Sequence, residues 1–304
     1  MNEKLKEIQK LIDEKGDYEL VAQTMDLSEI IPGCVVVSRS DLYEVFKNYH
    51  HHECYEIIYV IDGKISFFVE EKKYELTNGD MVFVAPNLLH KLIFEKQLEC
   101  KRVIINFVDE YVKKYTTKNT EILNIFKLIN EKGMHKVSFF PEKRKRLEKL
   151  FELMEKLNFS EKFGDDLRFD ISFAEMMLLV NKVYMNLPEE DLIQKNINDP
   201  YVIKIMEFIN KNIEKKILLN DIAEHLSLSI SRISHLFKSV TGISIMSYII
   251  KKRLATAKEL LKNGEHIKSV YIKCGFPDEA SFFRYFKQEY NITPKKYALS
   301  FIHD

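Results

Sequence analysis

Hydrophobic residues alternate in short runs in the first third of the chain and recur every three to four positions later on. From about Ile30 to Phe107, apolar runs rich in Val, Ile, Phe and Tyr are separated by Gly and Asn turns. This spacing is typical of strands that form a sandwich or jelly-roll barrel. From about Val108 to Leu187, and again from Pro200, the apolar period is helical. The pattern predicts an α+β chain with two domains.

Seven strands are expected in the first part. They are Cys34–Val37, Tyr55–Ile61, Lys64–Val69, Tyr74–Leu76, Met81–Ala85, Leu89–Phe94 and Lys101–Phe107. Asp62-Gly63 and Asn78-Gly79 each lie between consecutive runs, and both dipeptides favour the two-residue turns of hairpins. We therefore expect a β-hairpin at each of these positions.

The C-terminal part contains one structural unit twice, at an offset of 49 residues. Each copy reads as a short helix, a tight turn and a second helix, which is the helix-turn-helix arrangement that presents its second helix to the DNA major groove. A long helix from about Ser244 to Asn263 is expected to join the copies. The positions that recur are Phe237-Lys238 with Phe286-Lys287, Ser244 with Thr293, and Tyr248 with Tyr297.

Capping residues locate the ends of these helices. Asn220, Ser229 and Asp278 are expected to cap the N-termini of helices that begin after them. Gly275 tolerates the left-handed conformation that ends a helix. Phe237, Phe286, Tyr248 and Tyr297 fall on apolar faces and are expected in the core, not at DNA.

These residues resemble the DNA-binding domain of AraC/XylS-type transcription regulators. The resemblance is carried by the runs Ser229–Ser244, Arg253–Leu261 and Gly275–Pro294. It implies a double-stranded DNA partner, two recognition helices in adjacent major-groove segments, and an activator more often than a repressor. Where the family usually has a small Ala, this chain has Tyr271, so we expect that helix to pack differently.

The resemblance also implies which side chains face DNA. Lys238 and Lys287 suit phosphate contacts because Lys acts as a point charge on the backbone. Arg284 is the best single reader of guanine, given its fork of donors. Phe283 replaces a small polar residue and is expected either to touch a thymine methyl or to pack locally. The residues expected to face bases are Ser231, Arg232, Ser234 and His235 in the first unit, and Glu279, Ala280, Phe283 and Arg284 in the second.

The distribution of charge agrees with this assignment, although the formal net charge of the whole chain is zero. Residues 200–304 hold 17 Lys and Arg against 10 Asp and Glu, whereas residues 1–199 hold 29 against 36. The basic part is the part with the helix-turn-helix units, as attraction to phosphates requires. No apolar run has the length of a membrane span, the charged N-terminus is no signal peptide, and four Cys without CxxC spacing favour the reducing cytoplasm.

A second constellation lies in the expected barrel. His50, His52, Glu56 and Gly63, followed by Gly79-Asp80, Pro86 and His90, resemble the cupin pattern, and AraC-type regulators commonly carry a cupin-like sensor. Residues two and four apart in a strand share a face, so His50, His52 and Glu56 can converge, with His90 joining from a neighbouring strand. His51 and Glu53 are then expected to face the other way.

The resemblance favours a small-molecule effector in this barrel, with a sugar as a reasonable candidate, bound by His50, His52, Glu56, His90 and Tyr55. Tyr59 and Arg102 could line the same cavity. Three nitrogens and a carboxylate would also suit Zn, Fe, Mn or Ni. However, the Asn that often closes the second enzymatic cupin motif is missing after His90. No cofactor is therefore expected. The alternatives are a divalent metal held by the same four residues and histidines with a purely structural role.

The helical part that follows the barrel offers a dimer interface. A narrow apolar stripe has the spacing of a two-helix coiled coil, so we prefer a homodimer contact to packing against the chain's own barrel. Phe169–Met185 is apolar on nearly all sides and is expected to be buried. The stripe consists of Leu147, Leu150, Phe151, Met154 and Leu157.

Together these features predict a sensor and dimerisation domain at 1–187, a linker at 188–199 and a DNA-binding domain at 200–304. The expected function is a cytoplasmic, effector-controlled, sequence-specific transcription regulator that is not an enzyme and that can contact RNA polymerase. Two alternatives remain. One is a metal-dependent cupin enzyme with a DNA-binding tail, and the other is a constitutive DNA-binding module whose barrel only dimerises.

Overall fold

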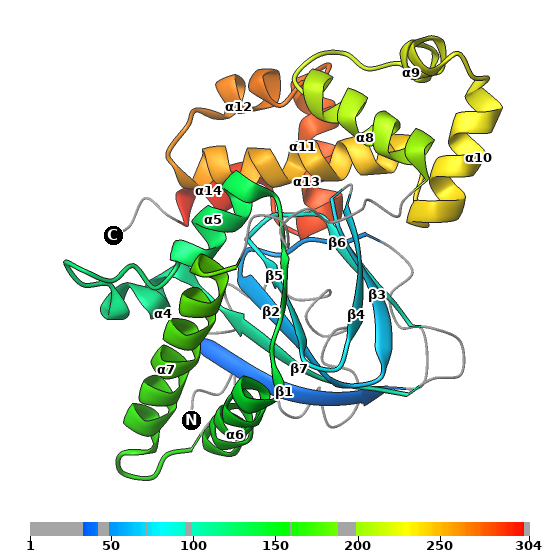
Figure 1. Ribbon diagram of the computed structural model, residues 1–304. Helices are drawn as coiled ribbons and strands as arrows, with labels where there is room; N and C mark the ends of the chain where they lie inside the picture. Colours follow the sequence, from blue (N-terminus) through cyan, green and yellow to red (C-terminus); the bar gives the residue numbers. More distant parts are fainter. Residues whose placement is uncertain are drawn as a thin grey trace.

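A computed structural model of the chain describes residues 33–41, 49–70, 72–94, 99–158, 160–187 and 199–300. Two antiparallel β-sheets pack face to face, long helices lie beside one sheet, and a second group of helices covers one end of the sandwich (Figure 1). The α+β class expected from the sequence is confirmed. Residues 188–198 of the expected linker lie outside the described residues.

The strands lie where the apolar runs predict them. One sheet has the order β1-β7-β2-β5-β8 and the other β4-β3-β6. The three-residue strand β8 has too short an apolar run to be visible in the sequence. The bounds are β1 Cys34–Asp41, β2 Tyr55–Asp62, β3 Lys64–Val69, β4 Lys72–Thr77, β5 Asp80–Val84, β6 His90–Phe94, β7 Cys100–Phe107 and β8 Lys136–Ser138.

The two hairpins expected at Asp62-Gly63 and Asn78-Gly79 are wrong. At each position the chain passes from one sheet to the other, because β2 and β5 belong to one sheet and β3 and β4 to the other. The two corners lie side by side, since Asn78 Nδ2 donates to Asp62 Oδ1 at 2.8 Å. Gly63 has φ +100°, and a Cβ there would lie 2.6 Å from the Glu99 carbonyl oxygen. The Asp-Gly and Asn-Gly dipeptides indicate a turn, but they do not indicate which strands pair with each other.

Successive residues of β2 point to opposite faces of the sheet and so belong to two different hydrophobic cores. Ile57 and Tyr59 face the long helices, whereas Ile58 and Val60 face the space between the sheets. The interior of the sandwich is filled by apolar side chains from both sheets, among them Phe67.

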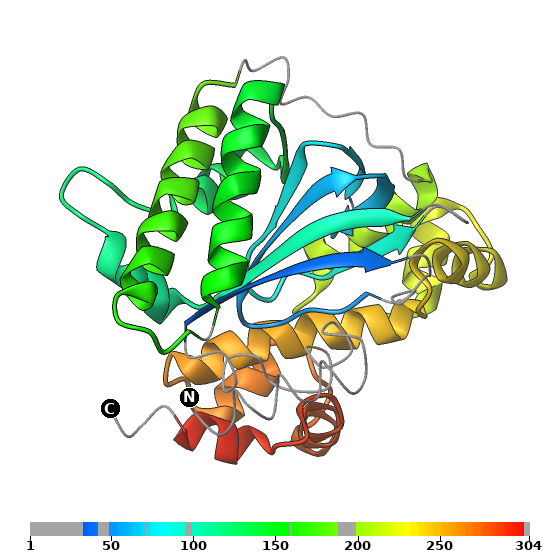
Figure 2. The same cartoon turned by 90° about the horizontal axis from the view of Figure 1, so that it is seen from below.

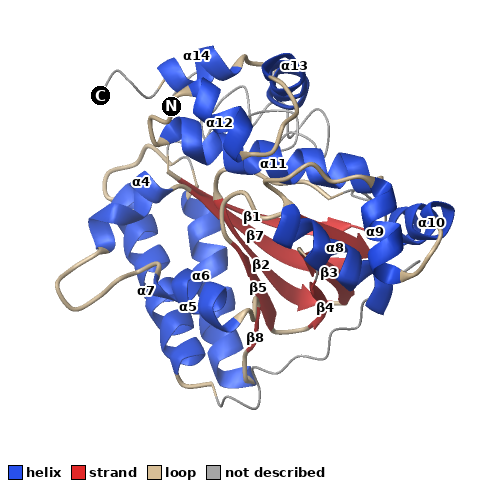
Figure 3. Cartoon of the chain, turned by 90° about the horizontal axis from the view of Figure 1, so that it is seen from above, coloured by secondary structure: helices blue, strands red, loops and turns tan. Residues whose placement is uncertain are grey.

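Helices of the first part cover the outer face of the five-stranded sheet (Figure 3). They are α4 Asp109–Val112, the 3₁₀ helix η1 Lys113–Tyr115, α5 Asn124–Lys132, α6 Pro141–Leu157 and α7 Asp165–Met185. The stripe predicted to form a dimer contact lies on α6, and its five residues are at most 8% exposed within one chain. That prediction is wrong, because the stripe packs in the same core as α7 and the sheet. The expected burial of Phe169–Met185 is also wrong for one face, where Ile171 and Leu178 are 58% and 50% exposed.

The second group of helices contains both expected units. Its helices are α8 Pro200–Asn212, α9 Leu219–Leu226, α10 Ile230–Thr241, α11 Ile245–Lys262, α12 Ile267–Lys273, α13 Glu279–Tyr290 and α14 Pro294–Leu299. No single helix among the described residues is long and apolar enough to cross a membrane, although α10 and α11 pass that test as a pair bent by 61°.

Two of the three helix starts inferred from capping, at Ser229 and Asp278, are confirmed. Ser229 and Asp278 accept backbone hydrogen bonds from Arg232 and Ser281, and Ser244 caps the connecting helix. The start at Asn220 is wrong. Helix α9 begins at Leu219, and its Asp221 carboxylate accepts from the Leu218 amide at 2.9 Å.

Helix α11 joins the two units rigidly. Tyr248 and Ile249 belong to the core of the first unit, and Leu254 and Leu261 to the core of the second. Buried Arg253 donates from Nε to the Ile213 carbonyl at 3.0 Å, which ties α11 to the end of α8. The long helix therefore fixes where the two second helices lie relative to each other.

Candidate functional site

The first recognition helix, α10, buries Ile233 and Phe237 and leaves its opposite face in solvent. The sequence-predicted DNA contacts Ser231, Arg232, His235 and Lys238 are exposed, and Ser234 is half-buried. All five therefore lie on the face that a DNA groove could reach.

The second recognition helix, α13, is arranged in the same way. Phe282 and Phe286 are buried, while the expected contacts Glu279, Ala280, Arg284 and Lys287 are exposed. The expected contact Phe283 is half-buried in the core of the second unit, with its ring 5.9 Å from that of Phe282. Of its two expected roles, local packing is therefore the one the structure shows. Tyr271 is accommodated in the same core, half-buried.

Helix α10 lies at one end of α11, whereas α13 lies beside its middle, where Lys251 pairs with Glu289. Figure 2 shows both recognition helices nearly end-on, so their axes run in roughly the same direction. Helices that enter successive major-groove segments of one duplex need such an arrangement.

A buried histidine cluster forms where the loop before β2 meets the start of β6. Glu56 comes from β2 and His90 from β6, and the backbones of His50 and His90 exchange two hydrogen bonds of 3.0 and 2.9 Å. His90 Nε2 lies 3.3 Å from one Glu56 oxygen, and His52 Nε2 lies 3.6 Å from the other. The ring of His50 is centred 4.2 Å from that of His90. The structure thus brings together four of the five residues that were assigned to the effector site, all except Tyr55.

Two of these rings are oriented by backbone carbonyl groups. His52 Nδ1 lies 2.9 Å from the Cys54 carbonyl oxygen, and His90 Nδ1 lies 2.8 Å from that of Leu88. Burial alone would raise the pKa of Glu56, but polar contacts and Coulombic attraction from His52 and His90 hold it well below its usual range. Glu56 is thus a buried carboxylate rather than a carboxylic acid.

Three other residues assigned to this cavity lie elsewhere. Tyr55 is stacked on Phe107 and its hydroxyl donates to Asp109, on the helix side of the sheet. The Tyr59 hydroxyl donates to Glu148 of α6. Arg102 is buried inside the sandwich, 4.9 Å from the Phe94 ring centre. Tyr55 and Tyr59 are odd-numbered in a strand whose even-numbered Glu56 joins the cluster, and this alternation was the signal against including them.

The loop that carries the cluster also contacts the second helix-turn-helix unit. Glu53 Oε1 accepts hydrogen bonds from Lys258 Nζ of α11 and from the Tyr297 hydroxyl of α14, each at 2.5 Å. Both partners in the ion pair are at least 90% buried. Burial and the nearby Lys251 and Lys258 lower the pKa of His51 well below its usual value, so its neutral ring can accept from the Tyr290 hydroxyl at 3.3 Å.

A second set of contacts reaches the first unit. The Glu70 carboxylate accepts hydrogen bonds from Lys252 and Tyr248 of α11. Lys91 of β6 donates to the carbonyl oxygen of Val240 near the C-terminus of α10. Burial and then the charge of Lys73 lower the pKa of Lys91 to about 8.

The cluster and these contacts alternate along the chain. His50 and His52 face the cluster, whereas His51 and Glu53 face the helices, as the sequence predicted. On β6, His90 faces the cluster and Lys91 reaches α10. We call Glu53, Lys258, Tyr297, Glu70, Lys252 and Lys91 the interdomain contacts.

Most of the interdomain contacts could not be predicted from the sequence. Lys258 offered a signal, because it falls on the apolar stripe of α11 between Leu254 and Leu261, where a solvated Lys is not expected. No such sequence signal marked the other charged contacts, Glu70, Lys252 and Lys91. Each of them belongs to a run of charged residues or lies in an edge strand.

The fold and these sites define a sensor barrel joined to a two-unit DNA-binding domain. Residues 32–168 match the model of the AraC-like ligand binding domain, and residues 222–299 match a helix-turn-helix domain model. The chain belongs to the AraC family of transcription regulators, as the resemblance implied.

Several relatives align along most of the chain. The transcriptional activator RhaR of Mannheimia succiniciproducens is 22% identical over 83% of this chain and 87% of its own length. The probable regulator LumQ of Photobacterium leiognathi is 24% identical over 85% and 95%. Among solved structures, ToxT of Vibrio cholerae O395 aligns over 89% of this chain and 99% of its own, with 15% identity and a TM-score of 0.34.

Proposed function

We propose that this protein activates transcription from a specific DNA site when a small-molecule effector binds at the histidine end of its barrel. The proposal rests on one observation: the residues of the cluster alternate with the interdomain contacts on the same two segments, 50–53 and 90–91. Relatives named as transcriptional activators support activation. An activator of this kind works in the cytoplasm and contacts RNA polymerase.

The proposed division of labour is a sensor domain at 1–187, a linker at 188–199 and a DNA-binding domain at 200–304. On DNA, Arg232, His235 and Arg284 read base edges, because they are exposed and carry suitable donors. Lys238 and Lys287, at the other end of each recognition helix, contact phosphates. The shorter side chains Ser231, Ser234, Glu279 and Ala280 set how closely the helices approach the groove.

Selection of bound sequences from random duplex DNA tests the DNA-binding part, with the full-length protein at a stated salt concentration. We expect a motif of two major-groove segments about one helical turn apart. A motif covering a single segment would show that α13 does not read bases, and its site residues would then be dropped.

The effector is proposed to contact His50, His52, Glu56 and His90. These residues present imidazole and carboxylate groups, which suit a polar ligand such as a sugar. A thermal-shift screen of sugars and organic acids tests this, because a ligand that binds only the folded state raises the unfolding midpoint. The signal must be lost in Glu56→Gln. If no compound in a broad library binds, the barrel serves only dimerisation, and DNA binding is constitutive.

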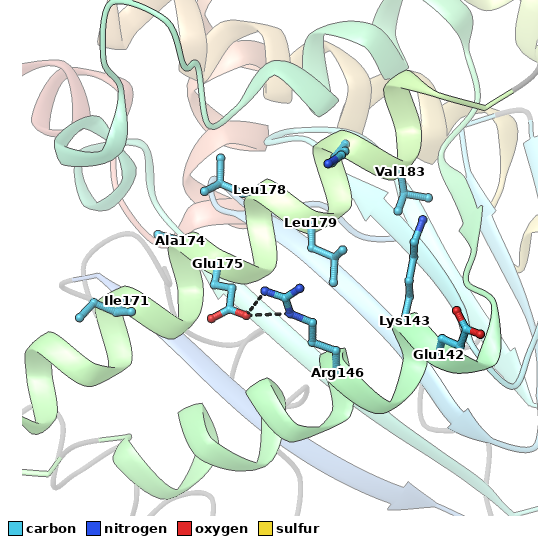
Figure 4. Close-up of a pocket in the computed structure, with 10 residues that line it drawn as sticks. Glu142, Lys143, Arg146, Ile171, Ala174, Glu175, Leu178, Leu179 and Val183 are labelled. Carbon is cyan, nitrogen blue, oxygen red and sulfur yellow. Dashed lines mark hydrogen bonds and ion pairs between the residues drawn. The ribbon is translucent and has the colours of Figure 1, made fainter.

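We also propose a homodimer, formed through the exposed face of α7. The groove between α6 and α7, about 770 Å³ in volume, is lined by Ile171, Leu178 and Leu179 and edged by charges of both signs (Figure 4). Arg146 and Glu175 pair across it at 2.6 Å. A two-fold interface must be complementary to itself, and a face that carries an apolar centre and both charges meets this condition.

Leu178→Asp is expected to convert the dimer to a monomer at the same protein concentration, because it places a charge in the apolar centre of the interface. Analytical ultracentrifugation measures the change. Ile272→Asp is the matched control, since Ile272 is a 61% exposed apolar residue on α12, away from the groove. If Leu178→Asp and the control sediment alike, α7 is not the interface.

A further inference from the structure

We propose that His52, Glu56 and His90 bind one divalent first-row transition-metal ion, with His50 beside them as a fourth ligand. The inference deepens the effector proposal, since it names what the histidine end of the barrel holds. The metal inference rests on the proposed effector site, but it does not require that this site regulates DNA binding. His52, Glu56 and His90 each offer one ligand atom, and these atoms all lie within 4.8 Å of one another.

The hydrogen bonds around the rings leave Nε2 of both His52 and His90 facing the Glu56 carboxylate. A neutral imidazole whose Nδ1–H donates to a carbonyl oxygen has a lone pair on Nε2. The Cys54 and Leu88 carbonyl groups hold His52 and His90 in this way. Both Nε2 atoms then direct lone pairs toward the Glu56 carboxylate, and neither makes a hydrogen bond. Three electron-rich groups therefore converge on one buried point.

The site is closed to solvent, since His90 is 1% exposed, and the rings of His52 and His90 have centres 4.8 Å apart. A divalent cation accepts both lone pairs and a carboxylate oxygen at once.

The spacing of the atoms also fits. Tetrahedral metal sites with bonds of about 2.0–2.2 Å place neighbouring ligand atoms roughly 3.3–3.6 Å apart. The two histidine–carboxylate separations, one to each Glu56 oxygen, are 3.3 and 3.6 Å, and the three ligand atoms lie within 4.8 Å of one another. The carbonyl groups that orient the rings are the kind of outer partner that metal-binding histidines generally have.

Titration of the full-length, tag-free protein with Zn²⁺ and with Co²⁺, after removal of metals by a chelator, tests the proposal. We expect about one equivalent to bind and the unfolding midpoint to rise. Glu56→Gln and His90→Gln should each weaken binding by more than the roughly 10–100-fold cost of losing an outer partner. His266→Gln is the control, because His266 is an exposed histidine on the helical side of the chain.

X-ray absorption of the Zn²⁺-loaded wild-type protein keeps the test independent of how the variants fold. Nitrogen and oxygen neighbours with imidazole scattering are expected, without sulfur. A sulfur neighbour would assign the ion to a site containing Cys54 or another cysteine and overturn the proposal. So would unchanged affinity in Glu56→Gln, or no binding at micromolar metal. If metal binding fails while an effector still shifts the unfolding midpoint, only this inference falls and the proposed function stands.

Discussion

Glu53→Ala is expected to separate the barrel from the DNA-binding domain. In the structure, the Lys258 side chain is 5% exposed, and its Nζ lies 2.5 Å from Glu53 Oε1. Removing one partner of a buried ion pair leaves the other charge uncompensated, which costs about 3–5 kcal/mol. This cost falls on the docked arrangement alone, because undocking returns Lys258 to water. The equilibrium should therefore shift toward the undocked state by a factor of roughly 10² to 10⁴.

Distances between spin labels on the two domains measure the shift. Thr77→Cys on the barrel and Lys268→Cys on α12 provide exposed attachment sites, and the native cysteines are buried or half-buried. A single short distance is expected to become a broad, longer distribution in Glu53→Ala. Glu152→Ala, which removes an exposed carboxylate on α6, should leave the distance unchanged.

Combining Glu53→Ala with Lys258→Met distinguishes the charge effect from lost packing. The double variant buries no charge, so docking should recover in part, and the two substitutions should be non-additive. Additive losses, or a distance in Glu53→Ala that matches the wild type, would show that the ion pair does not hold the domains together.

The interdomain contacts also define the limit of what the sequence could predict. Strands and helices were predictable because each follows from a local period, and the seven strands and the two helix-turn-helix units were found in this way. The histidine cluster was also predictable. Alternation placed His50, His52 and Glu56 on one side of the chain, and the resemblance to the cupin pattern added His90.

Pairings between distant segments were not predictable. Asp62-Gly63 and Asn78-Gly79 contain the residues of hairpin turns, yet each connects two sheets, because the partner of a strand depends on the whole sandwich. The stripe on α6 has the period of a coiled coil, but the same period serves packing on a sheet. Lys258 and Glu53 are 205 positions apart, and nothing local marks them as partners.

With the α6 stripe buried, a change in the barrel is not transmitted to a dimer partner through that stripe. The direct path is instead within one chain, from the histidine cluster through Glu53 to α11 and α14, and through Lys91 to the end of α10. An effector alters DNA binding by this path only if it binds the docked and undocked states with different affinity.

The second large effect is expected at DNA, from Arg284→Ala. Arg284 is exposed on α13, and its guanidinium carbon lies 4.8 Å from the Tyr285 ring centre, which restrains the side chain beside the groove-facing surface. A guanidinium fork that binds both acceptors of a guanine contributes about 1–3 kcal/mol of discrimination against other bases. The variant should therefore bind its best site more weakly by that amount and lose preference at one base position.

Lys287→Ala gives the contrasting result if the two roles are assigned correctly. Lys287 lies one turn further along the exposed face of α13, where a point charge contacts phosphate. Its loss should weaken binding to all sequences alike and reduce the salt dependence by about one phosphate contact, with the base preference intact. Arg284→Lys separates charge from geometry, since it keeps the charge and removes the fork. If Arg284→Lys retained full specificity, or if Arg284→Ala left every base preference unchanged, α13 would be a backbone-binding helix and sequence reading would rest on α10 alone.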